Sequence, residues 1–395
     1  MGGPLEGIRV LDFTIAQQGA YATLLMADMG ADVIKVEPPR GGEIGRFLAM
    51  DRRTGFSVFF LAVNRGKRSL TVDLKSEKGR EVALRLARDC DVVAHNFRPG
   101  VMEKLGLDYE AFKEVNPRII YATASAFGTK GRLSWKPGND ILAQAMSGLM
   151  STTGEDDVPL PTGAAIADHM SALTMALGIV TALLARERTG VGQKVETSLL
   201  GSTLAGQSWE LTHYLMTREK QPKAGRGNAL LPLIWYTYRT ADGYMAIGGV
   251  PPDRWHAFCE GIGWPELETD ERFGSVGGRI RDKAEFNRLL DEHFSTRSTE
   301  EWLQRLEAAD IFCAPVYDYP QVVEEPQVYD NDYLVPVQHP RLGEITMVNC
   351  PIQFSETPTA IGAAEPRLGE HTDEVLEGFG YGAEEIERLR EEGVV

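Results

Sequence analysis

Residues 5–37, LEGIRVLDFTIAQQGAYATLLMADMGADVIKVE, decide the fold class of this chain. The apolar and β-branched run Ile8–Phe13 predicts a strand, Ala20–Met29 predicts a helix, and Asp32–Val36 predicts the next strand. A strand, a helix and a second strand in this order are typical of a βαβ unit, whose two strands are parallel. The segment PPRGG that follows indicates a loop.

The same alternation continues through the first half of the chain. The later predictions are strands over Ser69–Leu74, Asp91–Ala94, Ile119–Ala124 and Val195–Leu199, and a helix over Glu77–Asp89. This pattern indicates an α/β fold with a mostly parallel sheet covered by helices, of Rossmann type. The first strand is followed by TIAQQGAYA and not by GxGxxG, so an NAD or FAD site with Glu37 as its ribose ligand has little support.

A long helix and a second lobe are predicted downstream. The apolar segment Met170–Ala185 has helical spacing, and the residues that share its apolar face are Met170, Leu173, Leu177, Val180 and Leu184. With about 16 residues it is shorter than the roughly 20 of a membrane span, so it predicts a buried core helix. A smaller α/β lobe is predicted from a hairpin over Trp235–Ile247 and helices over Trp255–Gly261, Lys283–Phe294 and Thr299–Ala309. The tail after about Gln327 is predicted to be extended, with a closing helix over Thr372–Gly378.

Composition limits the classes of function. The chain has 395 residues and a net charge of −16, which argues against general nucleic-acid binding. Its four cysteines form no CxxC pair and its seven histidines form no HxxxH pair, so neither a disulfide framework nor a metal site is predicted. The first residues, MGGPLEGIRVLDF, lack the pattern of a secretory signal, and a reducing cytoplasm is the expected location.

Asp168 is a candidate reacting group. It lies in GAAIADHMSAL (163–173), where small residues precede it and an apolar helix follows. The N–H groups at a helix start favour an ionised carboxylate, and small neighbours leave room for an acyl group. Local pattern alone favours the alternative, an ordinary first-turn or N-cap aspartate. His169 is not expected to face Asp168, because helical side-chain contacts run between residues three and four apart.

Basic residues in loops and at element ends of the first third form a second candidate site. They are Arg40, Arg65, Lys67, Arg68, Lys75, Arg98 and Lys104. Such a cluster in an acidic protein suits a nucleotide phosphate, and a scatter of solvated charges is an alternative of about equal weight. Core packing, rather than an acyl pocket, is the expected role of Trp209, Trp235, Trp255 and Trp302.

Several long segments resemble the class III (family III) CoA-transferases and occur in that family's order. They are LxGIRVLDFT…LxADMGADVIKVE, NRGKRSLTVDLKSEKGRE, NFRPGVMEKLGLDYE, NPRIIYATASAFG, DILAQAMSGLM, GAAIADHMSAL…LARERTGVGQKVETSL and RLGEHTDEVL. The resemblance runs from about Leu5 to Leu376. It implies an interlocked, ring-like homodimer, with a Rossmann-like large domain over residues 1–220 and 328–395 and a small α/β domain over 221–327.

The resemblance also implies a site and a reaction. The family's catalytic aspartate matches Asp168, and Gln17, which also matches a CoA-contacting position, is expected to assist it by hydrogen bonding. The other expected CoA contacts are Arg40, Val72, Lys75, Asn96, Phe97, Lys104 and Lys136, with Arg40 replacing an arginine whose aligned position holds Pro38. Coenzyme A is substrate and product, no metal is implied, and CoA moves from an acyl-CoA to a carboxylic acid through a mixed anhydride and an aspartyl-CoA thioester.

Two other functions stay open on the same fold. α-Methylacyl-CoA racemases use a histidine in a GHD motif, whereas this chain has Gly138-Asn139-Asp140, and asparagine cannot act as a base. The chain is alternatively one subunit of a heteromeric CoA-transferase, although Asp168 speaks against an inactive subunit. Neither a nucleic acid nor a membrane is an expected partner.

The donor and the acceptor are not identified by the sequence. Between Asn228 and Gly249 the chain lacks the glycine-rich loop of the formyl-CoA/oxalate branch, which makes oxalate a less favoured acceptor. The apolar residues in this segment suit a larger acyl chain or an aromatic acid, or simply form a strand of the small lobe. They are Leu230, Leu231, Leu233, Ile234, Trp235 and Tyr236.

Overall fold

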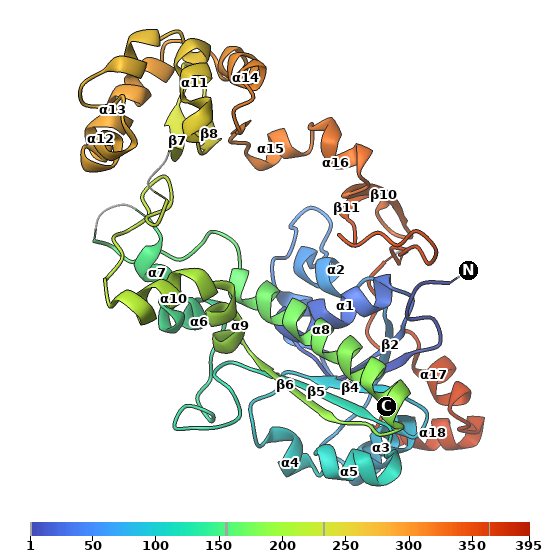
Figure 1. Cartoon of the computed structure of the whole chain (residues 1–395). Helices are drawn as coiled ribbons and strands as arrows, with labels where there is room; N and C mark the ends of the chain where they lie inside the picture. The colour runs from blue at the N-terminus through green and yellow to red at the C-terminus, as the bar shows by residue number, and fades with distance from the viewer. Residues whose placement is uncertain (1, 155–156, 232–233, 363) are drawn as a thin grey trace. The chain divides into compact units, whose positions relative to one another are not determined.

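The computed structural model in Figure 1 describes residues 2–154, 157–231, 234–362 and 364–395. Contacts along the chain divide it into two compact units. The first unit combines Met1–Ser147, Gly163–Gly206 and Pro326–Val395, and the second combines Gly148–Thr162 and Gln207–Glu325. The domain boundaries expected from the family resemblance, near residues 220 and 327, stay predictions.

The first unit is built on a six-stranded sheet with the order β3-β2-β1-β4-β5-β6. The strands are β1 (Arg9–Asp12), β2 (Asp32–Glu37), β3 (Arg68–Thr71), β4 (Val92–His95), β5 (Ile120–Ser125) and β6 (Lys194–Ser198). Neighbouring strands are parallel throughout, and Val10 of β1 is in register with Val33 on one side and Val92 on the other. This order is that of Rossmann folds, so the predicted parallel sheet is confirmed.

Helices cover both faces of this sheet (Figure 1). On one face lie α1 (Gln18–Asp28) and α8 (Ile166–Thr189), which bury side chains such as Ala22 and Met175 against the strands. On the other face lie α3 (Glu77–Ala87), α5 (Tyr109–Val115), α17 (Thr372–Gly378) and α18 (Ala383–Glu391). A sheet covered on both faces needs strands that are buried on both sides, and almost all residues of β1, β4 and β5 are buried.

The long helix α8 buries a different face from the one predicted. It has 24 residues, and the side chains that it packs into the core include Ala172, Met175, Ile179 and Leu183. Leu173, Leu177 and Leu184 of the predicted apolar face are 48%, 69% and 54% exposed. Small residues let a helix approach its neighbours closely, so the alanine-rich face packs inward and the spacing of the leucines indicated the wrong side.

The same helix is the one described helix that is long and apolar enough to cross a membrane, with a mean hydropathy of 1.5. A core helix passes this test of length and composition equally well. One face of α8 packs against the strands, as the predicted core helix requires.

The C-terminal part of the first unit contains more structure than the predicted extended tail. An antiparallel hairpin joins β10 (Leu334–His339) to β11 (Gly343–Val348), and α18 follows the predicted helix α17. The other helices of this unit are η1 (Ile44–Phe47), α2 (Val58–Asn64), α4 (Val101–Leu105), α6 (Asp140–Ser147), α9 (Leu199–Gly206) and α16 (Pro326–Asp330).

The second unit contains the hairpin and the three helices that were predicted for a smaller lobe. Its antiparallel sheet has the order β7-β8-β9, with β7 (Trp235–Arg239), β8 (Tyr244–Gly248) and β9 (Cys313–Pro315). The helices are α7 (Leu149–Thr152), α10 (Ser208–Thr217), η2 (Pro252–Arg254), α11 (Trp255–Ile262), η3 (Pro265–Thr269), α12 (Val276–Arg281), α13 (Lys283–Phe294), α14 (Thr299–Ala308) and α15 (Tyr319–Val322). Trp255 and Trp302 pack in the core as expected, whereas Trp209 and Trp235 are exposed. Leu233, one of the apolar residues considered for an acyl pocket, lies outside the described residues.

Candidate active site

A pocket of about 520 Å³ lies in the first unit beyond the carboxyl ends of β1, β4 and β5. Its walls are residues 15–18 after β1, 96–99 after β4, 136–139 before α6, and Asp168 of α8. The chain leaves β1 and β4 toward opposite edges of the sheet, as the strand order shows. Open α/β sheets bind ligands at such a switch point, so the topology itself places a ligand site here.

The pocket brings together part of the predicted site. The predicted residues that line it are Gln17, Asn96, Phe97, Lys136 and Asp168, and Arg98 of the predicted basic cluster lines it as well. The predicted residues that do not line it are Arg40, Val72, Lys75 and Lys104. Val72 is buried in the core, and the other three side chains are exposed. Their contacts with CoA stay predictions.

Three members of the basic cluster are engaged inside the first unit. The ion pairs are Arg65 with Asp28 at 2.6 Å, Lys67 with Asp12 at 3.0 Å, and Arg68 with Asp32 at 2.6 Å. A buried cation needs an opposite charge, and these carboxylates supply it. The three side chains are therefore not free phosphate ligands.

Asp168 lies in the first turn of α8, and Asp140 caps that turn. Asp140 Oδ1 accepts hydrogen bonds from the backbone nitrogen of Ala167 at 2.8 Å and from that of Asp168 at 3.2 Å. The N–H groups that were expected to favour an ionised Asp168 are thus taken by a second carboxylate. Burial, and then the charge of Asp140, raise the pKa of Asp168 to about 7. A carboxyl group that titrates near neutrality in a pocket is typical of a functional site.

Gln17 is oriented by the residue next to Asp168. Its amide nitrogen lies 2.7 Å from Nε2 of His169. An amide nitrogen can only donate, so Nε2 carries the lone pair and the ring proton sits on Nδ1. Tyr21 packs edge-on against the imidazole, with ring centroids 4.8 Å apart. As expected, His169 does not form a dyad with Asp168; it bonds Gln17 instead.

The loop that carries Gln17 is held by Asn96. The Oδ1 atom of Asn96 accepts from the backbone nitrogen of Ile15 at 2.8 Å, and its Nδ2 donates to the carbonyl of Ile15 at 2.8 Å. Both polar atoms of this side chain are thereby engaged with the loop. Gly19 allows this close approach, because a Cβ atom there would lie 2.5 Å from Thr14 and 3.2 Å from Asn96.

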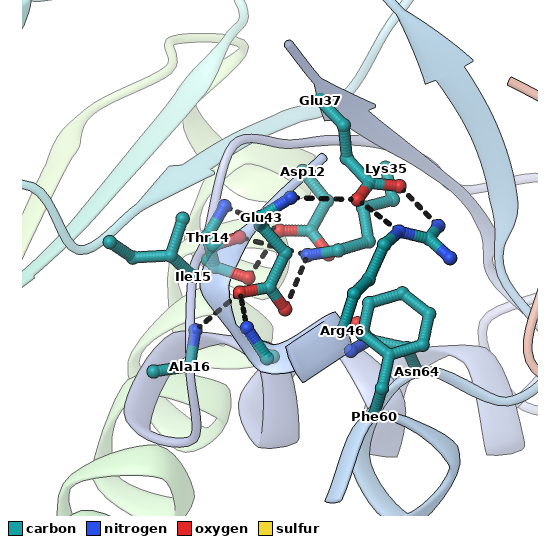
Figure 2. A network of polar contacts seen from close by, with 12 residues as sticks. Asp12, Thr14, Ile15, Ala16, Lys35, Glu37, Glu43, Arg46, Phe60 and Asn64 are labelled. Atoms are coloured by element: carbon teal, nitrogen blue, oxygen red, sulfur yellow. Dashed lines mark hydrogen bonds and ion pairs between the residues drawn. The ribbon is translucent and has the colours of Figure 1, made fainter. Parts of the chain in front are cut away.

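A buried carboxylate holds the next residue of the loop (Figure 2). Glu43 Oε2 accepts from the backbone nitrogen of Ala16 at 3.1 Å, and Ala16 has a left-handed φ of 54°. An alanine rarely adopts this conformation, so the hydrogen bond stabilises a backbone that the residue itself disfavours. Lys35 Nζ lies 3.7 Å from Glu43 Oε1 and donates to the carbonyl of Thr14 at 2.9 Å.

The carboxyl ends of β1 and β2 carry further buried charges (Figure 2). Burial opposes the ionisation of Asp12, but Lys67, Lys35 and the hydrogen bonds of Thr14 outweigh it and lower the pKa of Asp12. Burial lowers the pKa of Lys67 to about 8. Glu37, considered above as a ribose ligand, instead binds Arg46 through both oxygens, at 2.7 and 2.6 Å.

The described residues bring together no group of three or more histidine, cysteine, aspartate and glutamate side chains that could hold a metal ion. All four cysteines are free, and Cys90, Cys259 and Cys350 are buried.

Comparison with known proteins gives matches over nearly the whole chain. The model of CoA-transferase family III matches residues 5–372. The formyl-CoA:oxalate CoA-transferase of Streptomyces coelicolor is 36% identical over 409 residues, which cover 99% of each chain. The succinyl-CoA:glutarate CoA-transferase of Mus musculus is 33% identical and is matched over 90% of its length and 99% of this chain. The crystal structure of a CAIB/BAIF family protein from Brucella suis superposes with a TM-score of 0.86 at 30% identity, covering 96% of this chain and 100% of that one.

Proposed function

This chain belongs to CoA-transferase family III, and we propose that it moves CoA from an acyl-CoA to a carboxylic acid through a covalent intermediate on Asp168. One observation carries the assignment of the nucleophile. Asp168 lines a pocket at the switch point of the sheet, and its pKa is raised to about 7. A carboxyl group with this pKa is partly ionised at neutral pH, and a carboxylate of higher pKa is the better nucleophile.

The reaction begins with two exchanges at carbonyl carbon. A carboxylate oxygen of Asp168 attacks the acyl carbon of the donor thioester, the C–S bond breaks, and CoA leaves as a thiolate from a mixed anhydride. The thiolate then attacks the carbonyl carbon of the Asp168 side chain, the anhydride C–O bond breaks, and the donor carboxylate leaves. The product is an aspartyl-CoA thioester, which conserves the thioester energy of the donor.

The second half repeats these exchanges with the acceptor. A carboxylate oxygen of the acceptor attacks the aspartyl carbonyl carbon and releases CoA thiolate, which forms a second mixed anhydride. The thiolate attacks the acceptor's acyl carbon, so that acceptor-CoA forms and the Asp168 carboxylate is regenerated. No net proton transfer is needed in either half.

Each attack places negative charge on a carbonyl oxygen, which needs hydrogen-bond donors in the pocket. The amide of Gln17 is such a donor, and it lines the same pocket as Asp168. An Asn96–Phe97 segment and Lys136 form other walls, where we place the end of the CoA molecule that carries the thiol. The exposed cations Arg40, Lys75 and Lys104 are proposed for its phosphates.

The substrates are proposed only as classes. The named relatives use formyl-CoA with oxalate and succinyl-CoA with glutarate, so family members at similar identity differ in donor and acceptor. A carboxylic acid as acceptor and an acyl-CoA as donor are common to both names.

We propose that the working enzyme is an interlocked dimer in the cytoplasm. The support is the row Leu173, Leu177 and Leu184, which leaves an apolar face of α8 exposed in the single chain. Light scattering coupled to size-exclusion chromatography should give twice the chain mass, and Leu177→Glu should shift the mass toward the monomer. A monomeric wild-type protein would point instead to a related chain as the missing partner.

Trapping the intermediate tests the proposal. The protein is incubated with a panel of acyl-CoAs, treated with hydroxylamine or borohydride, and analysed by peptide mass spectrometry, with Asp168→Asn as the control. A modification at Asp168 that is absent from the variant is the expected result, and the acyl-CoAs that produce it identify the donor. Exchange of an α-proton with deuterated water in the absence of any modification would instead establish racemase chemistry.

A further inference from the structure

We propose that His169 is a positioning residue for acyl transfer: it binds one N–H of the Gln17 amide and leaves the second N–H for the carbonyl oxygen that becomes negative in the pocket. The inference rests on the proposed function. It assigns His169 no contact with substrate, because this residue is not part of the pocket wall and acts through Gln17.

The geometry gives the contact a specific use. The Gln17 amide nitrogen and His169 Nε2 are 2.7 Å apart, which is a short hydrogen bond. A glutamine side chain has three rotatable bonds, and fixing it on its own costs rotamer entropy. A partner that already holds one amide N–H orders the side chain before the substrate arrives.

The position of His169 on α8 couples the donor to the nucleophile. His169 directly follows Asp168 in the same 24-residue helix, and Asp168 lines the pocket together with Gln17. The attacking carboxylate and the amide that stabilises the resulting charge are thus both held by α8: Asp168 belongs to this helix, and Gln17 is bonded to His169 of the same helix. A shift of α8 would move both together, which keeps their separation constant.

The protonation state of His169 decides whether it can accept the hydrogen bond. Burial lowers the pKa of His169, and Asp140 acts in the opposite direction. The groups that face the ring are Gln17, Tyr21 and Asp140, and Asp168 is the neighbouring acid on its own helix. A neutral ring accepts at Nε2; a protonated ring donates there, so the Gln17 amide must turn and present its oxygen instead.

A packing role for this half-buried ring is the competing explanation, and two substitutions separate the roles. His169→Gln places a side-chain oxygen where Nε2 lies and keeps an acceptor, whereas His169→Leu keeps bulk and removes it. His256→Gln is the matched control, because His256 is exposed and bonds Glu268 on the surface of the second unit.

Steady-state kinetics of the full-length enzyme provide the first readout. His169→Leu should lower kcat by about 10- to 100-fold, which is less than the loss of a complete oxyanion donor, with the KM for acyl-CoA changed by less than about threefold. His169→Gln should keep kcat within about threefold of the wild type. Equal losses in the two variants would overturn the proposal.

The pH profile provides the second readout and does not depend on the leucine variant folding. Below neutral pH, log kcat/KM of the wild type should fall first with a slope of 1, as Asp168 takes up a proton, and then with a slope approaching 2, as His169 does. His169→Gln should keep a slope of 1 throughout, since glutamine does not titrate. A slope of 2 that persists in His169→Gln would also overturn the proposal.

Labelling of Asp168 in the same preparations separates this inference from the proposed function. If Asp168 of the wild type is not modified by any acyl-CoA, the proposed function itself is wrong. Normal labelling of the wild type, with His169→Leu as active as the control His256→Gln, would remove only the role of His169.

Discussion

Two aspartates of the first unit, the buried Asp12 and the half-buried Asp168, have pKa values that are shifted in opposite directions. Asp12 ends β1 between Lys67 and Lys35, and its pKa is lowered despite complete burial. Asp168 begins α8 beside Asp140, and its pKa is raised to about 7. Burial penalises the charge of both carboxylates, so the sign of the neighbouring charge decides the direction of each shift: lysines lower the pKa of Asp12, and Asp140 adds to the rise for Asp168. The first region uses its aspartate to hold a loop, and the second holds an aspartate whose pKa lies near neutrality at the wall of a pocket.

The largest expected effect is on Asp168 itself. Asp168→Asn should lower the CoA-transfer rate by at least about 10³-fold, because an amide cannot form the proposed anhydride. The rate is measured with an acyl-CoA that labels the wild type. A variant that retains most of the wild-type rate would contradict the assignment of the nucleophile.

The same substitution should stabilise the fold above neutral pH. The folded-state pKa of Asp168 is raised, so the folded protein binds its proton more tightly than the unfolded chain and loses stability as pH rises toward and through about 7. Urea unfolding should therefore show Asp168→Asn as more stable than the wild type at pH 8, with no difference at a pH low enough to protonate the aspartate in both states. If Asp168→Asn were instead less stable than the wild type at pH 8, the ionised Asp168 would stabilise the fold, as Asp12 does.

Asp12→Asn should have the opposite effect on stability. The substitution leaves the buried ammonium group of Lys67 without its carboxylate, which costs about 3 to 5 kcal/mol for a broken buried pair. Urea unfolding at pH 7 measures it, and Asp89→Asn on the surface is the control. An unchanged urea midpoint would mean that the ion pair between Asp12 and Lys67 does not stabilise the fold.

Glu43→Gln should have a larger effect on kcat than on the free energy of unfolding. Glutamine can still accept from Ala16, but its amide group no longer neutralises Lys35, so the loop that carries Gln17 is held less firmly. We expect a kcat about 10-fold lower, since small displacements of catalytic groups have effects of this order. Glu187→Gln, an exposed substitution of the same kind, is the control. An unchanged kcat in Glu43→Gln would show that this hold on the loop is dispensable.

The smallest expected effect is a displacement of the pH profile. Asp140→Asn keeps an oxygen that can cap α8 and removes the charge that raises the pKa of Asp168. The rate of the wild type should rise with pH up to about 7, because only the ionised Asp168 attacks. In Asp140→Asn the rise should occur at lower pH, and an unmoved profile would leave burial as the sole cause of the raised pKa.

The elements that the sequence predicted well are those with strong local patterns. The strand near Ile34 and the helix Lys283–Phe294 follow directly from hydrophobic periodicity. The buried face of α8 was not predicted correctly, because two sides of this helix are apolar and periodicity does not distinguish the side that packs, with Ala172, Met175 and Ile179, from the side of leucines that stays exposed. The hairpin of β10 and β11 was missed, because its strands are short of buried residues and contain Pro336.

The site was predictable only in part for a similar reason. Asp168 and Gln17 were identified through motif resemblance, and the pocket brings them together. The capping by Asp140 and the support from Glu43 depend on contacts between residues 27 or 28 positions apart, to which no local pattern points. The effect of a neighbouring charge on the pKa of a carboxyl group can be judged only once the fold has brought the two groups together.

The buried charges beneath the loop also have an evolutionary consequence. Asp12, Lys35, Lys67 and Glu43 neutralise one another, so a neutral substitution at any one position strands a charge at another. A substitution at one of these positions is expected to be tolerated only together with a compensating substitution at another. The effects of substitutions on stability are therefore strongly non-additive in this part of the enzyme. Residues 136–139 of the pocket wall are exposed, so a substitution there strands no buried charge, although Gly138 has no room for a Cβ atom beside Ala126 and Phe127. Single changes that alter substrate choice are therefore easier to accommodate in this wall than in the loop that the buried charges hold.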